Sequence, residues 1–348
     1  MSKISSQLRY LPGGYSRWSQ GRAANVNLVT GSGVSATPRH APGLIPGKNG
    51  AMTGTDTDQI QRVVSPSGVF AVHSAGAHVT HWETPEHGPL IFVSEKSGYG
   101  LGTPIRGGIP LCFPWFGAGA SGGKSPKHGF ARLVNWRLVS ESENSIGDWT
   151  VSFALSNEDL SAEDLSAKDP NTALFPHPFE AAYTATFTGT SLTASLEVTN
   201  RGTEPFTFEE ALHTYFRVGD IRQTEITGLE GAAYLDKAAS SPTAGDDPIY
   251  QEGPVTFSGE VDRVYSSRGT TTIIDKQNQR LIRIEKSHSK TTVVWNPWSE
   301  LAKGMSDLGD DEWTQFVCVE SANAGDSAVT LSPGATHTLR VTYTVTSA

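Results

Sequence analysis

Cysteine is scarce in this sequence, and long apolar runs are absent from it. The two cysteines, Cys112 and Cys318, are too few for a disulfide framework and form no Cys-x-x-Cys pair, which excludes zinc-ribbon and thioredoxin-like proteins. No stretch of about 18 apolar residues occurs, so the sequence predicts no membrane span. The N-terminus also lacks the compact apolar core of a secretory signal. We therefore expect a soluble, cytoplasmic protein with no membrane partner.

Acidic residues are absent before Asp56, although they outnumber basic residues in the whole chain. The 348 residues include 27 Lys and Arg against 36 Asp and Glu, a net charge of −9. Six of the basic residues precede Asp56, and the remaining 21 basic and 36 acidic residues give residues 56–348 a charge of −15. A body of this charge repels a polyphosphate backbone, so we expect no nucleic-acid partner. An anionic ligand would need a local cluster of Arg or Lys.

Residues 1–55 are rich in Gly, Ser, Pro and Ala and show no sustained periodicity. Three interpretations stay open for this segment. The first is a disordered or irregular N-terminal extension. The second is a transit peptide, since such peptides are typically Arg-bearing, Ser-rich and poor in acids. The third is a translation start placed too far upstream. Met52 is one of only three methionines, and strand-like sequence begins soon after it. We expect one domain over residues 56–348.

Short strand-like segments fill that domain. Charged residues make up only 18% of the sequence, while Gly (36) and Pro (20) are plentiful, which argues against long helices and against a disordered protein. Alternating or β-branched segments predict strands over residues 68–72, 90–93, 149–155, 183–187, 192–198, 271–275, 281–284, 291–295, 316–319 and 338–345. Residues 157–167 are a short helix or, given their acids, a solvated loop. The pattern predicts an all-β fold, a large antiparallel β-sandwich.

Three histidines lie close together near the start of the domain. His73, His78 and His81 belong to the segment HSAGAHVTHW. Residues three apart in a strand face opposite sides, which disfavours a metal ion shared by His78 and His81. We expect no metal site and no cofactor.

Two titratable residues lie in apolar strand-like segments. In ALHTYF (211–216), alternation places His213 and Tyr215 on one face of the strand. His213 is either a hydrogen-bonded core histidine or a functional group. In FVCVE (316–320), Glu320 ends an apolar run and is either solvated at the strand end or directed into a cleft. Spacing alone leaves both questions open.

Aromatic and glycine-rich segments form a third feature. PIRGGIPLCFPWFG (104–117) combines an arginine with glycines, prolines and three aromatic rings, KHGFAR (127–132) places His128 near Arg132, and WNPW (295–298) supplies two indoles. Aromatic faces beside planar hydrogen-bond donors suit sugar rings and their hydroxyls. The two interpretations are a sugar-binding site and an aromatic core with surface arginines.

These segments together resemble one known family. PIRGGIPLCFPWFG, KHGFARLVNWRL, ALHTYFRVGDI, VVWNPW with the following KGMSDLG, and FVCVESANA come in the order of the hexose-6-phosphate mutarotases, the glucose-6-phosphate 1-epimerase branch of the aldose 1-epimerase superfamily. The resemblance covers roughly residues 60–345 and leaves residues 1–55 outside it. It implies the galactose-mutarotase-like β-sandwich, in agreement with the strand pattern.

The resemblance also implies roles for individual residues. His213 and Glu320 match the family's catalytic histidine and glutamate. Arg106 of RGGIP and Arg132 of HGFAR match the arginines expected to bind the substrate and its phosphate. His128 belongs to the same HGFAR motif and is expected to line the cleft.

Two further residues belong to the expected site, and the resemblance also implies the reaction. Asp262 in EVDRVY resembles the family's sugar-binding acid, and Lys127, where relatives often carry Gln, is a point charge that can reach phosphate. The implied reaction interconverts the α and β anomers of an aldohexose 6-phosphate, with Glu320 as base and His213 as acid, in a monomeric protein. The alternatives are an aldose 1-epimerase acting on free hexoses, a non-catalytic sugar-binding module on the same fold, and a lyase or glycosidase with Asp262 as its second carboxylate.

Overall fold

The computed structural model describes residues 60–160, 175–238, 241, 245 and 247–348. The expected extension of residues 1–55, its boundary at residue 56 and residues 161–167 of the expected helix or loop lie outside this part of the chain. Within it, strands predominate, and the one α-helix, α1 (Trp298–Lys303), has six residues. The predicted all-β class is therefore confirmed. No helix of the described part is long and apolar enough to cross a membrane.

The first main sheet has eight long strands that pair antiparallel throughout. Alternate side chains of β8 and β9 are buried, while Thr184 and Thr186 of β8 hydrogen-bond to hydroxyls of β7 on the other face. This is the pattern of a sheet with one covered face. The strands in spatial order are β13 (Thr224–Thr227), β17 (Thr271–Asp275), β18 (Arg280–Ser287), β22 (Thr336–Ser347), β9 (Ser191–Asn200), β8 (Phe179–Phe187), β7 (Trp149–Ser156) and β6 (Arg137–Glu143).

The second main sheet is built from shorter strands and contains the segments expected to carry chemistry. Its strands in spatial order are β15 (Ile249–Tyr250), β14 (Ala233–Asp236), β16 (Val261–Ser266), β19 (Thr291–Asn296), β20 (Phe316–Asn323), β11 (Glu210–Leu212) and β5 (Leu111–Cys112), with β12 (Tyr215–Arg217) also paired to β20. All eight residues of β20 are buried, so both faces of this strand are covered.

Two small sheets and several 3₁₀ turns complete the described part. The small sheets consist of β1 (Ile60–Ser65), β2 (Gly68–His73), β3 (His78–Thr84) and β4 (Gly88–Pro89), and of β10 (Phe206–Phe208) with β21 (Val329–Leu331). The turns are η1 (Ala131–Leu133), η3 (Ile221–Gln223), η4 (Glu312–Gln315) and η5 (Gly325–Ser327).

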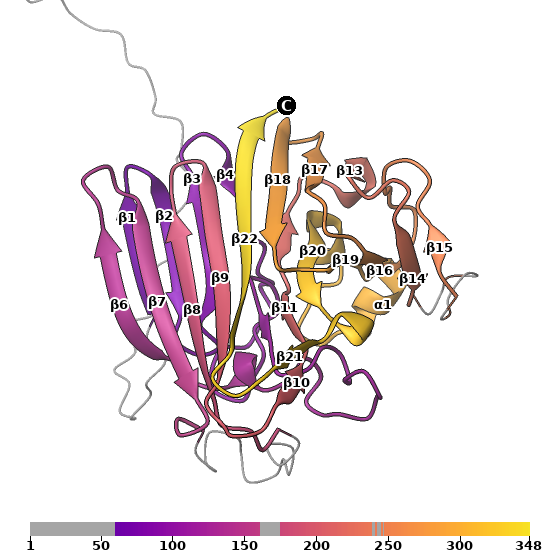
Figure 1. Cartoon of the computed structure of the whole chain (residues 1–348). Coiled ribbons are helices and arrows are strands. Elements are labelled where there is room, and N and C mark those ends of the chain that lie inside the picture. The colour runs from indigo at the N-terminus through magenta and orange to yellow at the C-terminus, as the bar shows by residue number, and fades with distance from the viewer. Residues whose placement is uncertain (1–59, 161–174, 239–240, 242–244, 246) are drawn as a thin grey trace, which may run out of the picture. The chain divides into compact units, whose positions relative to one another are not determined.

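The hydrophobic core lies between the first main sheet and a layer formed by the four-stranded sheet and the second main sheet (Figure 1). Phe70 of β2 stacks on Phe187 of β8 with ring centroids 4.8 Å apart, and Tyr343 of β22 meets Phe216 of β12 edge-on at 5.3 Å. Burial of each such side chain contributes about 1.5–3 kcal/mol. The Tyr343 hydroxyl is hydrogen-bonded to Oγ1 of Thr214 at 2.7 Å. These cross-layer contacts confirm the predicted sandwich.

A buried ion pair within the first main sheet also bonds to the other layer through its arginine. Nε of Arg280 on β18 lies 3.0 Å from Oδ2 of Asp275 on β17, and the two side chains are 2% and 1% exposed. The other guanidinium N–H groups donate to the carbonyl oxygens of His87, Pro89 and Arg217. The buried charge is therefore paired and hydrogen-bonded, which a charge in the interior requires.

The segment 90–93 differs from the prediction of a strand. It makes only isolated bridges, Ile91 with Phe216 and Val93 with Gly107. The segment runs between β12 and the glycine-rich stretch. Its backbone hydrogen bonds are divided between these two neighbours, so it forms no continuous ladder with either of them. Its apolar run reflects burial and not strand pairing. The other nine segments predicted as strands lie within strands.

Candidate active site

The chain leaves the sheet ladder briefly at His213. β11 ends at Leu212 and β12 begins at Tyr215, and both strands pair with β20. Between them the N–H of His213 donates to the carbonyl of Pro110 at 3.1 Å. The rings of His213 and Tyr215 stack with centroids 5.0 Å apart and planes within 10°. The two side chains thus share one face, as the alternation predicts.

Glu320 lies inside β20 and faces His213. The strand continues to Asn323, so Glu320 is not at a solvated strand end. Its side chain is 1% exposed, and its Oε1 lies 3.3 Å from Nε2 of His213, whose side chain is 10% exposed. Of the two interpretations from the sequence, solvation at a strand end is therefore wrong.

Burial shifts the pKa values of this pair in opposite directions. Burial raises the pKa of Glu320 well above its usual range, and the nearby Asp262 charge adds to the effect. Burial lowers the pKa of His213 well below its usual range, and Arg132 and Arg106 disfavour a further positive charge there. Two groups this close titrate as a pair. Both shifts disfavour the charged forms, so burial favours the neutral pair, with the proton on Glu320 and a neutral His213.

Arg106 reaches the site from the loop that contains RGGIP. One of its terminal nitrogens donates to the Tyr215 hydroxyl at 3.0 Å, and the other lies 3.0 Å from Oδ2 of Asp307. The following Gly107 has a φ of +115°, and a Cβ there would lie 2.4 Å from the carbonyl oxygen of Phe92. Only glycine permits this close approach, which explains the first glycine of the motif.

Arg132 and His128 come from the turn that precedes and forms η1. A terminal nitrogen of Arg132 donates to the Lys127 carbonyl at 2.8 Å. The ring of His128 lies edge-on to the ring of His213, with centroids 5.4 Å apart. Burial, together with the charges of Arg132 and Lys127, lowers the pKa of His128 to about 3. The Lys127 side chain itself is exposed, so of the expected residues it is the one at the rim.

Asp262 lies on β16 across the sheet from the histidine. Asp262 pairs with Trp295 of β19, Trp295 pairs with Cys318 of β20, and Cys318 pairs with Tyr215 of β12. The four residues thus form one row across the sheet. Burial, with the charges of Glu260 and Asp236, raises the pKa of Asp262 to about 6. The carboxylate therefore belongs to the same polar region as Glu320.

Three residues of the region were assigned no role from the sequence. Tyr215 and Asp307 hold Arg106, and the ring of Trp295 lies edge-on to those of His213 and Tyr215 at 6.2 and 6.0 Å. Sequence signals existed for each, in the ALHTYF alternation, the KGMSDLG segment and WNPW. None of these signals predicts which residues the three side chains contact.

Buried polar atoms without hydrogen-bond partners converge at this place. Within the described residues they include Nε of Arg106, Nε of Arg132, Nδ1 of His213 and Oε2 of Glu320. A buried polar atom is normally satisfied, so these donors and acceptors can bond to a polar ligand. The described residues contain no cluster of three or more His, Cys, Asp or Glu side chains placed to hold a metal ion.

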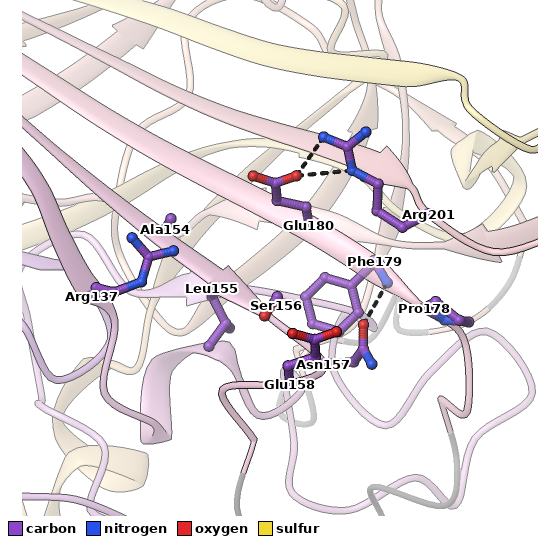
Figure 2. A pocket seen from close by; sticks show the side chains of 10 residues that line it. All are labelled: Arg137, Ala154, Leu155, Ser156, Asn157, Glu158, Pro178, Phe179, Glu180 and Arg201. Atoms are coloured by element: carbon purple, nitrogen blue, oxygen red, sulfur yellow. Dashed lines mark hydrogen bonds and ion pairs between the residues drawn. The ribbon is translucent and has the colours of Figure 1, made fainter.

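A surface hollow of about 470 Å³ lies elsewhere. Figure 2 shows it at the ends of β7 and β8, where its lining includes Arg137, Glu180 and Arg201. Nε of Arg201 donates to the Glu180 carboxylate at 2.9 Å, so this cation is already paired. The expected site residues do not line the hollow, and we do not assign the activity to it.

The aldose 1-epimerase family matches the chain over residues 65–344. A Cenchrus ciliaris protein named "Putative glucose-6-phosphate 1-epimerase" is 34% identical over 269 residues, 76% of this chain and 77% of the relative. An Escherichia coli K12 protein of the same name is 33% identical over 253 residues, 72% and 79% of the two chains.

Solved structures of mutarotase-like proteins are also similar to this chain. The structure titled "a putative mutarotase (YeaD) from Salmonella typhimurium" matches with a TM-score of 0.71 and 28% identity over 82% of this chain and 90% of that one. A galactose mutarotase-like protein from Clostridium acetobutylicum, 14% identical, shares the fold with a TM-score of 0.62 over 84% and 96% of the two chains. The resemblance and the galactose-mutarotase-like fold are confirmed: the chain belongs to the aldose 1-epimerase family and is an isomerase of sugar anomers.

Proposed function

We propose that this enzyme interconverts the α and β anomers of an aldohexose 6-phosphate, with glucose 6-phosphate as its substrate. The observation that carries the proposal is the contact between Nε2 of His213 and Oε1 of Glu320, 3.3 Å apart in a buried site. The names of two relatives, 34% and 33% identical to this chain, point to the same sugar phosphate.

The reaction needs one proton removed and one delivered. The Glu320 carboxylate takes the proton of the C1 hydroxyl, the C1–O5 bond breaks with its electron pair going to O5, and His213 gives O5 a proton from Nε2. The product is the open-chain aldehyde. After rotation about the C1–C2 bond the same steps run in reverse and close the ring on the other face.

Proton balance favours such a pair. Ring opening moves one proton onto Glu320 and one away from His213, so the pair starts and ends with a single proton. The opposite pKa shifts of the two groups favour the arrangement that ring opening produces, with the proton on Glu320 and a neutral His213. Each positioned acid or base contributes roughly 10²- to 10⁴-fold to the rate.

Phosphate recognition rests on the cations beside this pair. Arg132, with Lys127 at the rim, supplies positive charge in a chain of net charge −9, and Arg106 supplies a third cation that is held by Asp307. Guanidinium groups bind phosphate oxygens in pairs. The proposed ligand is thus a small sugar phosphate. We expect the enzyme to be a monomer.

The test compares glucose with glucose 6-phosphate on the same protein by NMR exchange spectroscopy. We expect anomer exchange of the phosphate to be accelerated more strongly, and expect Arg132→Ala to reduce that preference. Equal acceleration of both sugars, or preference for glucose, would assign the enzyme to free hexoses. Binding of either sugar with no change in exchange rate would reduce it to a sugar-binding module.

A further inference from the structure

Glu209 is a buried carboxylate that lies four residues before His213 and outside the proton-transfer pair. Its side chain is 6% exposed, and it stands between β10 and β11. Both of its oxygens accept backbone hydrogen bonds. Oε2 accepts from the N–H of Phe116 at 3.1 Å, and Oε1 accepts from the N–H of Gly325 at 2.7 Å. Glu209 therefore fixes the turn that ends the segment 104–117.

The next N–H in that turn reaches the active site. The N–H of Gly117 donates to Nδ1 of His128 at 3.3 Å, and the N–H of His128 donates back to the Gly117 carbonyl at 2.7 Å. Two consecutive N–H groups thus connect the Glu209 carboxylate to the His128 imidazole. His128 has a φ of +67°, in the left-handed region that a histidine adopts only when its surroundings hold it there.

These contacts determine which nitrogen of His128 carries its proton. A backbone N–H can only donate, so Nδ1 must accept and cannot be protonated. Sγ of Cys112 lies 3.4 Å from the same Nδ1. Burial raises the pKa of the Cys112 thiol, which keeps it as a second donor. The proton of the neutral ring is therefore on Nε2.

The remaining surroundings also favour a neutral ring. The charged or titratable groups that face it are Arg132, Lys127 and Arg106, together with Cys112 and His213. The three cations oppose a positive charge on the imidazole. In the described part of the chain Nε2 has no hydrogen-bond partner, and the ring lies against His213, so this donor is available to a ligand.

We propose that Glu209 is a positioning residue which, through the Phe116–Gly117 peptide, holds His128 as a neutral donor that presents its Nε2–H to the sugar. This role rests on the proposed function for its ligand, but the state of the histidine can be measured without any substrate. A loosened turn would free Nδ1. His128 could then gain a second proton, and its charge would oppose protonation of His213.

The test uses Glu209→Ala and Glu209→Gln, with Glu210→Gln as the matched control. Glu210 is adjacent and also buried, but its carboxylate bonds to Asn323 and His337 and not to the turn. Long-range ¹H–¹⁵N NMR on histidine-labelled protein reports the tautomer, and His128→Gln identifies the signal. Exchange spectroscopy from pH 5 to 8 gives kcat/KM for glucose 6-phosphate.

In the wild type and in Glu210→Gln we expect the Nε2–H tautomer throughout this pH range. In Glu209→Ala we expect a mixture of tautomers that titrates, and a kcat/KM lower by about tenfold, the scale on which loss of a supporting hydrogen bond acts at metal-bound histidines, with the loss growing as the pH falls. Glu209→Gln, which keeps one acceptor oxygen, should lie between.

Three results would overturn the proposal. One is an Nδ1–H tautomer, or titration near 6.5, for His128 in the wild type, a measurement that stands even if neither Glu209 variant folds. Another is an unchanged tautomer in a folded Glu209→Ala whose activity falls equally at every pH, which would make Glu209 merely structural. The third is an equal change of tautomer in Glu210→Gln. An enzyme inactive on hexose phosphates but with the expected tautomers would refute only the proposed substrate.

Discussion

Nε2 of His213 lies 3.3 Å from Oε1 of Glu320, because the break between β11 and β12 that contains His213 lies opposite Glu320 on β20. On the two sides of the break in the ladder, Leu212 pairs with Ser321 and Tyr215 pairs with Cys318. The two residues in the break, His213 and Thr214, therefore lie opposite Glu320 and Val319, and strand register fixes the distance between the proposed acid and base. Side chains placed by rigid strands are held more precisely than side chains on loops.

Replacing either member of this pair should remove most of the activity. We expect His213→Ala and Glu320→Gln each to lower kcat by roughly 10²- to 10⁴-fold, the usual contribution of a positioned acid or base. Exchange spectroscopy on glucose 6-phosphate measures the effect. The control is His337→Gln, because His337 and Glu210 form a second His–Glu pair, with Nε2 and Oε1 2.7 Å apart, away from the site. Wild-type exchange in His213→Ala, or an equal loss in His337→Gln, would contradict the assignment.

The strands that the sequence predicted are mostly longer ones in which buried side chains alternate with less buried ones. Residues 183–187 and 338–345 alternate clearly; the structure starts the first strand at Phe179 and extends the second to Thr336–Ser347. β6 (Arg137–Glu143) was missed because all seven of its side chains are exposed, which leaves no apolar period to detect. The order of strands in each sheet is set by contacts between distant segments, and local periodicity carries no information on it.

For the site, the sequence supplied residue types and faces but not distances. Alternation placed His213 on the face of Tyr215, and the resemblance to a family singled out Glu320. The contact between Arg106 and Asp307 could not be predicted, because Asp307 comes from a loop after α1, some 200 residues further along the chain. Which of two buried acids meets a turn, Glu209 or Glu210, depends likewise on side-chain directions beside a strand end.

Asp262 should make the folded protein less stable as the pH rises from about 4 to about 6. Its pKa is raised from 3.8 to about 6, so in this range the folded state binds more protons than the unfolded state, and stability falls with increasing pH. We expect Asp262→Asn to raise the free energy of unfolding at pH 7 by about 2 kcal/mol, reduced for partial solvent access from about 1.4 kcal/mol per pKa unit. The same variant should lose kcat/KM.

Urea unfolding at pH 4 and pH 7 checks the Asp262 prediction, since the gain should vanish at the lower pH. Asp220→Asn is a control of opposite sign, because hydrogen bonds from Arg222 lower the pKa of Asp220. That variant should be destabilised at pH 7 and not at low pH. Equal stability of wild type and Asp262→Asn at pH 7 would mean that the carboxylate is solvated and not buried in the site.

The ion pair of Arg280 and Asp275 should be important for folding and not for catalysis. Arg280→Met leaves the buried Asp275 carboxylate without its countercharge and three carbonyl oxygens without this donor, so we expect a loss of about 3–5 kcal/mol in the free energy of unfolding. Arg283→Met on the same strand is the matched control. Arg283 pairs with Glu285 at the surface, and its loss should leave the urea midpoint unchanged. A shift in Arg280→Met no larger than in this control would refute the prediction.

Asp307 should act on the reaction only through Arg106. Its Oδ2 lies 3.0 Å from a terminal nitrogen of Arg106, and Tyr215 holds the other terminal nitrogen at 3.0 Å. Asp307→Asn replaces a charge-assisted hydrogen bond, worth about 1.5–3 kcal/mol, with a neutral one. We expect kcat/KM for glucose 6-phosphate to fall by about tenfold, which corresponds to 1.4 kcal/mol.

A double-mutant cycle separates this role from a direct contact of Asp307 with the sugar. If Asp307 only positions Arg106, then Asp307→Asn should cost little more once Arg106→Lys is present, because the group it orients is already gone. Asp310→Asn is the matched control, since Asp310 lies in the same loop but pairs with Lys96 at the surface, and its activity should equal that of the wild type. Additive losses in the double variant would instead place the Asp307 carboxylate on the substrate. In that case Asp307 would be a binding residue in its own right, and the guanidinium of Arg106 would keep its position through Tyr215 alone.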